Sequence, residues 1–276
     1  MKGKVLVQSK KRDSVFLLLL LGLFILRFPF LISVSYGVIP IPKDMGNIIF
    51  GNVTYLITAV LILIMRDSLS KYNIGFYSLA VFLAAPFFKL LSIRYTAMFS
   101  LLPYPWFQIA VSICLFILLL IFHPKLRKRS SKEILFWLLI AVAAGICGGV
   151  IMGNIASLQG SGRLAYRPSF CYVIYAFFVQ LSNAAVMEEP LFRGFLWGYL
   201  KNAHCKETWI WAFQAALFMI GHVYYLGVYN YSFWIIVPVS ALILGLLAWR
   251  SRSIGTSMIA HGLINSIADA VAHFTW

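Results

Sequence analysis

The chain has 276 residues, of which 62% are hydrophobic and 11% are charged. A soluble domain is usually about 45–50% apolar and about 25% charged, so this composition excludes an ordinary soluble protein. The formal net charge of +15 does not indicate a nucleic-acid partner, because no basic segment carries interleaved aromatic residues or a recognition motif. The basic excess is instead typical of cytoplasmic loops in a membrane protein, and the acidic residues are few because lipid excludes them.

Long apolar runs, bounded by charged residues, glycine or proline, follow one another along the whole chain. Since about 20 apolar residues cross a bilayer as an α-helix, we expect an all-α, polytopic membrane bundle of about eight to nine transmembrane helices. The predicted spans are residues 14–39, 47–65, 74–93, 101–122, 133–152, 169–200, 207–226, 231–249 and 254–274. The first run continues past Arg27 to Ile39, which favours an uncleaved helix over a signal peptide.

The basic residues are distributed unequally between the two sides of these spans. With the N-terminus on the cytoplasmic side, most of the 23 Lys and Arg residues fall in cytoplasmic loops, so the positive-inside rule predicts this orientation. The basic stretch 125–132 separates an N-terminal part, residues 1–130, from a C-terminal part, residues 131–276. We interpret this stretch as a solvated loop rather than a lipid-headgroup or regulatory site, and the chain as one continuous membrane domain.

Three of the eight acidic residues lie within predicted spans: Glu188, Glu189 and Asp269. A carboxylate in hydrocarbon is costly, so these side chains should face a polar interior and have partners. Residues four apart share one face of a helix, which predicts that Glu189 pairs with Arg193. Glu188 then points elsewhere and is free to act as a base or as a metal ligand.

Two histidines also lie in apolar runs, His222 and His261. Gly221, directly before His222, allows a neighbouring helix to approach closely. Asn265 and Asp269 follow His261 at intervals of four residues, which predicts a polar stripe along one helix.

Two chemistries are open for these residues. The carboxylate of Glu188 with the imidazoles of His222 and His261 is the ligand set that a catalytic zinc ion uses. Alternatively, Glu188 acts as a general base on water, and His or Asn side chains steady the oxyanion.

Three segments together resemble the CPBP family of membrane proteins, which includes the type II CAAX prenyl endopeptidases and the bacterial Abi proteins. The motifs that carry this resemblance are Glu188-Glu189-x-x-x-Arg193, Phe218-x-x-x-His222 and His261-x-x-x-Asn265. They occur in the family's order and on separate predicted spans, and the resemblance covers about residues 169–274. It implies that residues 131–276 are the catalytic core and that residues 1–130 are variable.

The resemblance also implies roles for the motif residues. Glu188 would activate the attacking water, and Glu189 with Arg193 would support it. His222 would assist in water activation or bind metal, and His261 with Asn265 would supply a second ligand or stabilise the oxyanion. The cofactor would be zinc or another divalent metal, or none. Asp269 lies outside the motifs, and we expect it to orient His261 or Asn265.

The expected function is that of an intramembrane endopeptidase in a bacterial cell membrane. Its partners would be membrane lipid and a peptide or lipidated-protein substrate, either prenylated or similar to a bacteriocin precursor or signal peptide. The alternative is a non-proteolytic membrane scaffold or immunity protein of the same family. A transporter is less favoured, because the sequence has no internal repeats. The oligomeric state is not assigned.

Overall fold

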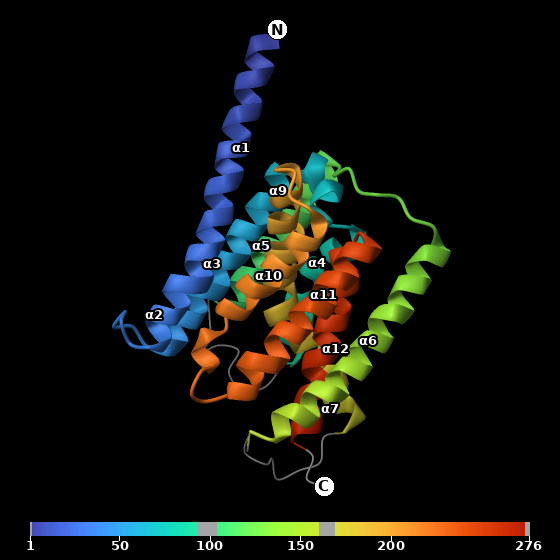
Figure 1. Cartoon of the computed structure of the whole chain (residues 1–276). Helices are drawn as coiled ribbons and strands as arrows, with labels where there is room; N and C mark the ends of the chain where they lie inside the picture. Colours follow the sequence, from blue (N-terminus) through green and yellow to red (C-terminus); the bar gives the residue numbers. More distant parts are fainter. Residues whose placement is uncertain (1, 93–103, 160–168, 274–276) are drawn as a thin grey trace.

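The computed structural model describes residues 2–92, 104–159 and 169–273, with side chains for residues 11–91, 105–159 and 169–273. Every regular element in these ranges is a helix, which confirms the predicted all-α fold (Figure 1). Helices suit such an apolar chain because they satisfy every backbone polar group within the segment itself, where lipid offers no hydrogen-bond partner.

The N-terminal part begins with one long helical run and continues with separate helices. The run consists of α1 (Lys2–Ile25), the π-helical turn η1 (Leu26–Phe30) and α2 (Leu31–Ser35). It is followed by α3 (Lys43–Ile64), the short 3-10 helix η2 (Arg66–Tyr72), α4 (Phe76–Ser92) and α5 (Tyr104–Phe122). An extended connection then leads into the C-terminal part.

The C-terminal part contains α6 (Ser131–Ser157) and a second long run with two π-helical turns. This run comprises α7 (Phe170–Gln180), η3 (Leu181–Ala185), α8 (Val186–Glu189), η4 (Pro190–Leu196) and α9 (Trp197–Asn202). The remaining elements are α10 (Glu207–Ile220), η5 (Val223–Tyr225), η6 (Ser232–Ile236), α11 (Val237–Ser251) and α12 (Ile254–Ala272).

Fewer helices meet the requirements for a membrane span than the sequence analysis predicts. Within the described residues six segments are long and apolar enough, and a seventh counts if Arg66–Tyr72 and Phe76–Leu91, which are bent by 108°, form one broken span. The six are Lys11–Ser35, Lys43–Ile64, Pro105–Phe122, Ser131–Ser157, Phe170–Asn202 and Ser232–Ser251. The predicted count of eight to nine is therefore not confirmed. One reason is that α10 has 14 residues, which is too short to cross a bilayer alone.

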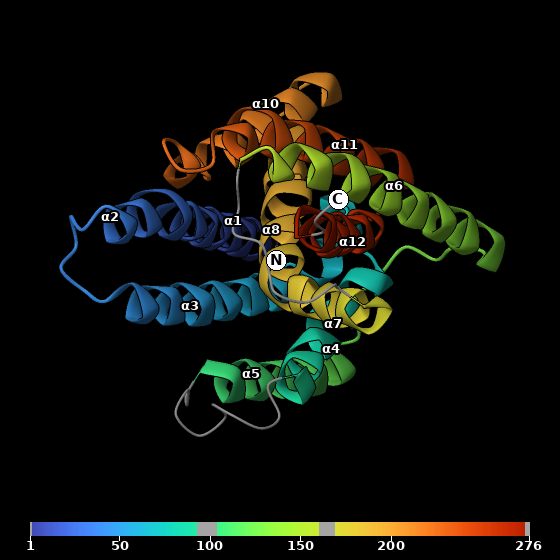
Figure 2. The ribbon, with the colours of Figure 1, turned by 90° about the horizontal axis from the view of Figure 1, so that it is seen from below.

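The first helix packs against the run that carries the two glutamates. Phe16, Leu20 and Leu23 of α1 belong to the same cluster of buried residues as Phe192 and Phe195 of η4. Viewed along the bundle, α8 lies at the centre, with α1 and α3 on one side and α12 on another (Figure 2). The centre of the protein is therefore built from both parts of the chain.

A row of glycines on α6 allows α12 to pack closely against it, and α12 carries His261. A Cβ atom on Gly145, Gly149 or Gly153 would lie 2.5–2.6 Å from a side chain of α12, at Leu263, Ile267 or Val271. Such distances are too short for carbon atoms, so the two backbones approach this closely only because the glycines lack side chains.

Gly149→Ala is expected to lower the free energy of unfolding by about 1–3 kcal/mol, because the added methyl group overpacks this contact. Its Cβ would lie 2.6 Å from the Ile267 Cβ atom and 3.2 Å from the Ile264 carbonyl oxygen. Unfolding of the purified protein in detergent measures the effect. Gly22→Ala is the matched control, since the nearest atom there, the Ile57 Cδ1 atom, is 3.6 Å away. Equal stability of the two variants would contradict the prediction.

Candidate active site

The two adjacent glutamates form the end of α8 and lie between the π-helical turns η3 and η4. Pro190 begins η4 and lacks the backbone N–H that a regular α-helix would use at this position. Turns of this kind are frequent at functional sites, where they redirect side chains within a helix. Glu188 is 6% exposed and Glu189 is fully buried, so both carboxylates depend on protein partners.

Glu189 pairs with Arg193, as their spacing predicts. The Arg193 Nη1 atom lies 3.2 Å from the Glu189 Oε1 atom, and both side chains are fully buried. The Arg193 Nη2 atom donates a hydrogen bond of 3.2 Å to the Ala241 carbonyl on α11. Its guanidinium also lies 4.5 Å from the centre of the Phe218 ring on α10. Arg193 thus links the helix of the glutamates to two neighbouring helices.

His261 of α12 lies against both glutamates. Its Nδ1 atom is 2.9 Å from the Glu189 Oε1 atom, and since a carboxylate only accepts, we assign the proton to the imidazole nitrogen. The other ring nitrogen, Nε2, then lies 3.8 Å from the Glu188 Oε2 atom. Glu189 therefore orients this histidine so that Nε2 faces Glu188.

His222 approaches Glu188 from another direction. Its Nδ1 atom donates to the Phe218 carbonyl over 2.8 Å, and its Nε2 atom lies 4.0 Å from the Glu188 Oε1 atom. The sequence analysis places His222 within a span, but α10 ends at Ile220, so this residue lies just beyond the helix. The end of the helix leaves the Phe218 carbonyl available, which accounts for the orientation of the ring.

The structure brings five of the six predicted site residues into one cluster and places the sixth beside it. The amide nitrogen of Asn265 donates to the Gln180 Oε1 atom over 3.1 Å. Asp269 accepts a hydrogen bond from the Tyr172 hydroxyl and lies 3.5 Å from the His273 Nδ1 atom. Among the described residues no hydrogen bond or ion pair joins Asp269 to His261 or Asn265. The carboxylate that orients His261 is Glu189, not Asp269 as we expected.

Arg27 of the first helix is a member of this cluster that sequence reasoning missed. Its Nη2 atom forms an ion pair with the Glu188 Oε1 atom and lies 3.4 Å from the His222 Nε2 atom. Arg27 is 6% exposed and belongs to η1, where Pro29 interrupts the regular helix. The sequence did contain a signal, because an arginine within an apolar run requires a polar partner in the membrane.

Gly221 allows the first helix to come this close. A Cβ atom at this position would lie 2.8 Å from the Phe28 Cε1 atom and 3.5 Å from the Arg27 Nε atom. The close approach that the sequence analysis predicts at Gly221 is therefore present, and the approaching helix is the first one. It delivers Arg27 to the cluster from the part of the chain that we expected to be variable.

Charge in the cluster is balanced. Arg27 and Arg193 carry positive charges that match Glu188 and Glu189, and the two histidines are neutral in the assignment given above. Such balance is needed because an unpaired charge away from water is strongly unfavourable.

Aromatic rings close the site on the side of His222. The ring centres of Tyr224 and Tyr225 lie 5.7 and 5.5 Å from the centre of the His222 ring.

Three residues of the site are of the types that bind a catalytic metal ion. Glu188, His222 and His261 have the right chemistry, since the two Nε2 atoms face the carboxylate and both Nδ1 atoms are held by acceptors. The guanidinium of Arg27, however, lies between Glu188 and His222, where its charge would repel a metal cation. No group of three or more His, Cys, Asp or Glu side chains in the described ranges is close enough to hold a metal. In this arrangement the residues do not fit a metal ion.

Comparison with known proteins agrees with the motifs. Residues 170–267 match the family model described as Rce1-like, type II CAAX prenyl endopeptidase. The matched range includes all six predicted site residues and leaves out Asp269 and Arg27. No curated protein and no solved structure matches the chain significantly. Residues 170–267 of the chain are therefore similar to the CAAX-type proteases of the CPBP family.

Proposed function

We propose that this protein hydrolyses a peptide bond of a membrane-associated substrate, using a water molecule activated by Glu188. The observation that carries the proposal is the position of the Glu188 carboxylate, which lies between Arg27, His222 and His261. The substrate classes are a prenylated C-terminal tail or a peptide similar to a bacteriocin precursor or signal peptide. The family match supports the reaction class.

The distances around Glu188 suit a water-mediated reaction. Its two oxygens lie 3.8 and 4.0 Å from the Nε2 atoms of His261 and His222, which is too long for direct hydrogen bonds and suitable for a bridging water. In the proposed reaction Glu188 takes a proton from this water as its oxygen attacks the peptide carbonyl carbon. Glu188 then returns the proton to the amine that leaves when the C–N bond breaks.

Arg27 is the proposed partner of the oxyanion. When Glu188 becomes protonated, its negative charge passes to the carbonyl oxygen of the tetrahedral intermediate. The guanidinium of Arg27 lies beside Glu188, and its buried Nε–H has no hydrogen-bond partner in the described part of the chain. The guanidinium can therefore donate a hydrogen bond to the oxyanion from close to the position in which it pairs with the carboxylate. Because the Asn265 amide donates to Gln180, we assign the oxyanion to Arg27 rather than to Asn265.

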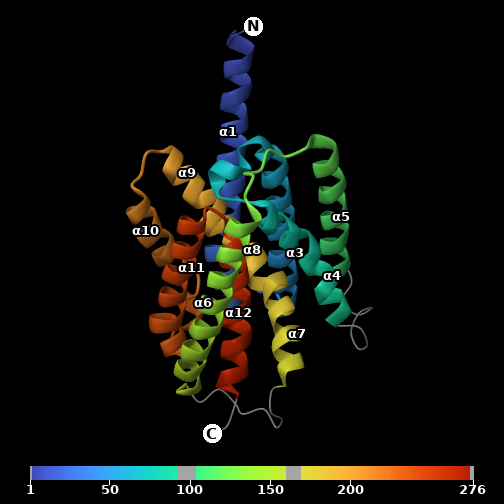
Figure 3. The ribbon, with the colours of Figure 1, turned by 90° about the vertical axis from the view of Figure 1, so that its right-hand side faces the viewer.

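The orientation that we propose places the N-terminus in the cytoplasm. The start of α1 and the end of α12 lie at opposite ends of the bundle (Figure 1). α1 extends beyond the bundle at the end where the connections from α5 to α6 and from α9 to α10 also lie (Figure 3). Those connections include Lys125, Arg127 and Lys206. The positive-inside rule assigns this end to the cytoplasm. A bacterial cell membrane is the proposed location.

The experiment that tests the function is a cleavage assay with the full-length protein reconstituted in lipid vesicles. The probes are a peptide with a prenylated C-terminal cysteine motif, the same peptide without the prenyl group, and a set of signal-peptide fragments. Mass spectrometry of the products identifies the bond that is cut. If none of these peptides is cut, hydrolysis of a membrane-associated peptide is wrong for this protein. The cluster would then be a structural network of ion pairs, as a membrane scaffold or immunity protein would need.

A chelator is expected to leave the cleavage rate unchanged, because Arg27 supplies positive charge at the place that a metal would take. The assay compares the rate with and without EDTA, together with metal analysis of the purified protein. A control metalloprotease in the same vesicles shows that the chelator reaches membrane sites. About one equivalent of zinc, lost together with activity in a His222→Ala and His261→Ala double variant, would contradict the prediction and establish a metalloprotease.

A further inference from the structure

A cavity with a strongly basic lining lies apart from the glutamate–histidine cluster. Its volume is about 340 Å³, and its charged lining residues are Arg127, Lys128, Arg129 and Arg252. No acidic residue of the described chain lines it. We call this cavity the basic pocket. It lies at the stretch that the sequence analysis interprets as a solvated loop, where most side chains are exposed and Arg129 donates to the Ser251 carbonyl at the end of α11.

The cations of the basic pocket are only partly neutralised by their surroundings. Glu133 lies 3.7 Å from Arg127 and 3.9 Å from Arg129, and Glu207 lies 2.7 Å from Arg252. No described carboxylate lies within 4.0 Å of Lys128. Two carboxylates therefore face four cations, and the remaining positive charge favours an anionic ligand.

Three helices begin at the basic pocket. Phe76, the first residue of α4, lines it, and so does Ser253, whose side chain caps the start of α12. Arg129 directly precedes Ser130, which caps the start of α6. Each of these two serines accepts one N–H group of its helix, and the other N–H groups of a first turn, with the positive end of the helix dipole, are available to an anion. Together with the four cations and the cavity, these helix starts suit a phosphate group.

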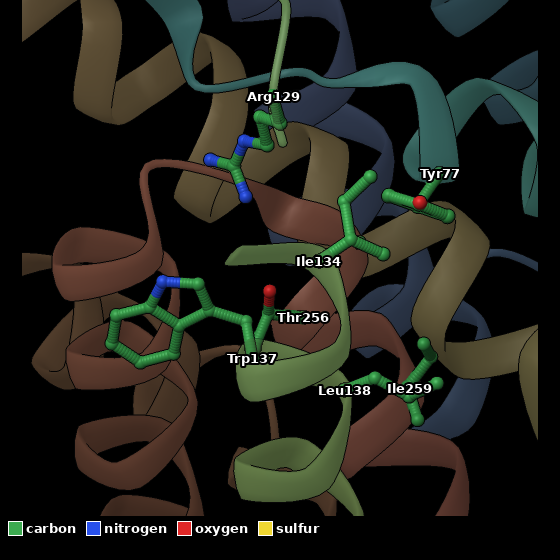
Figure 4. Close-up of a pocket in the computed structure, with 8 residues that line it drawn as sticks. Tyr77, Arg129, Ile134, Trp137, Leu138, Thr256 and Ile259 are labelled. Atoms are coloured by element: carbon green, nitrogen blue, oxygen red, sulfur yellow. The ribbon is translucent and has the colours of Figure 1, made fainter. Parts of the chain in front are cut away.

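An apolar slot adjoins the basic pocket and shares Tyr77, Arg129 and Ile134 with it. The slot has a volume of about 40 Å³, and Arg129 lies at one end of it while Leu138 and Ile259 lie at the other (Figure 4). Leu138 is 40% exposed and lies on the predicted membrane helix α6, so the slot is next to the lipid phase. A charged pocket that continues into an apolar slot matches an amphiphile better than a free anion.

We propose that the basic pocket binds the phosphate of an anionic glycerophospholipid and that the adjoining slot receives the beginning of an acyl chain. The location supports this occupant, because the pocket is at the basic end of the bundle, where phospholipid headgroups lie. Bound lipid connects α4, α6 and α12, and α12 carries His261. This proposal does not depend on the proposed protease activity.

The test measures binding of dioleoylphosphatidylglycerol and dioleoylphosphatidylcholine to the full-length protein in detergent, by native mass spectrometry and thermal unfolding. We expect phosphatidylglycerol to bind more tightly and to raise the unfolding temperature. A Lys128→Gln and Arg252→Gln double variant should bind it at least about tenfold more weakly. The matched control is a Lys125→Gln and Lys132→Gln double variant, which removes the same charge from residues that do not line the pocket.

Three results would overturn the proposal. The first is equal binding of the two lipids. The second is an equal loss of binding in the control variant, which would mean attraction by surface charge alone. The third comes from inorganic phosphate and glycerol 3-phosphate, added at constant ionic strength: if they stabilise the protein as much as the lipid does, the ligand is a soluble phosphate and the acyl chain has no part in binding.

Discussion

Glu188→Gln is expected to lower the rate of peptide cleavage by about 10³-fold or more, because glutamine keeps the shape of the side chain but cannot take a proton from water. The proposed reaction gives Glu188 both proton transfers, so kcat should fall far more than KM changes. The vesicle assay with a prenylated peptide measures both constants. Asp44→Asn is the matched control, since Asp44 is an exposed carboxylate in the first turn of α3 and lies away from the site.

The same substitution leaves the Arg27 guanidinium without its carboxylate, so the variant is expected to be less stable. A double variant, Glu188→Gln with Arg27→Gln, restores the balance of charge. It should regain stability and stay inactive, which separates loss of catalysis from loss of folding. Cleavage by the folded Glu188→Gln variant at more than about a tenth of the normal rate would show that another group activates the water.

Arg27→Gln is expected to reduce kcat by about 10²–10³-fold with little change in KM, because the oxyanion forms only after the substrate has bound. Arg27→Lys keeps the positive charge but has no forked donor, and it should keep part of the activity. If Arg27 had only a structural role, Arg27→Lys would restore activity by restoring stability. If Arg27 stabilises the oxyanion, kcat of the folded lysine variant stays reduced while KM changes little. Separate measurement of kcat and KM therefore distinguishes the two roles. Arg12→Gln, an exposed position on the same helix, is the control.

Two other outcomes would give Arg27 a different role. A higher kcat in Arg27→Gln would mean that the ion pair with Glu188 holds the enzyme inactive. A rise in KM that disappears when the C-terminal carboxylate of the peptide is amidated would mean that Arg27 binds the substrate carboxylate. Either result would leave the oxyanion without the partner proposed here.

Contacts between side chains on the same face of a single helix could be predicted well from the sequence. Glu189 and Arg193 are four residues apart, and helical geometry alone requires that they share a face. The membrane environment makes such arguments stronger, because a buried carboxylate without a partner is too costly to persist. The same reasoning predicts that Glu188, His222 and His261 form a group.

Contacts between helices that are far apart in sequence are harder to predict from the sequence. Periodicity shows which face of α12 is polar, but not that His261 binds Glu189 while Asn265 binds Gln180. The apolar runs likewise indicate where helices lie but not where they end. Because α10 stops at Ile220, His222 is held by the last carbonyls of that helix instead of lying within it.

The sequence by itself determined the membrane class, the helical fold and the three motifs, because composition, periodicity and i,i+4 spacing are local properties of the chain. Only the tertiary structure decided that Arg27 enters the site, because its partner Glu188 is 161 residues away and the approach depends on the missing side chain of Gly221. Only the structure, likewise, shows that the basic loop lines one cavity together with the starts of α4 and α12. Both results come from packing between distant segments, which no local pattern specifies.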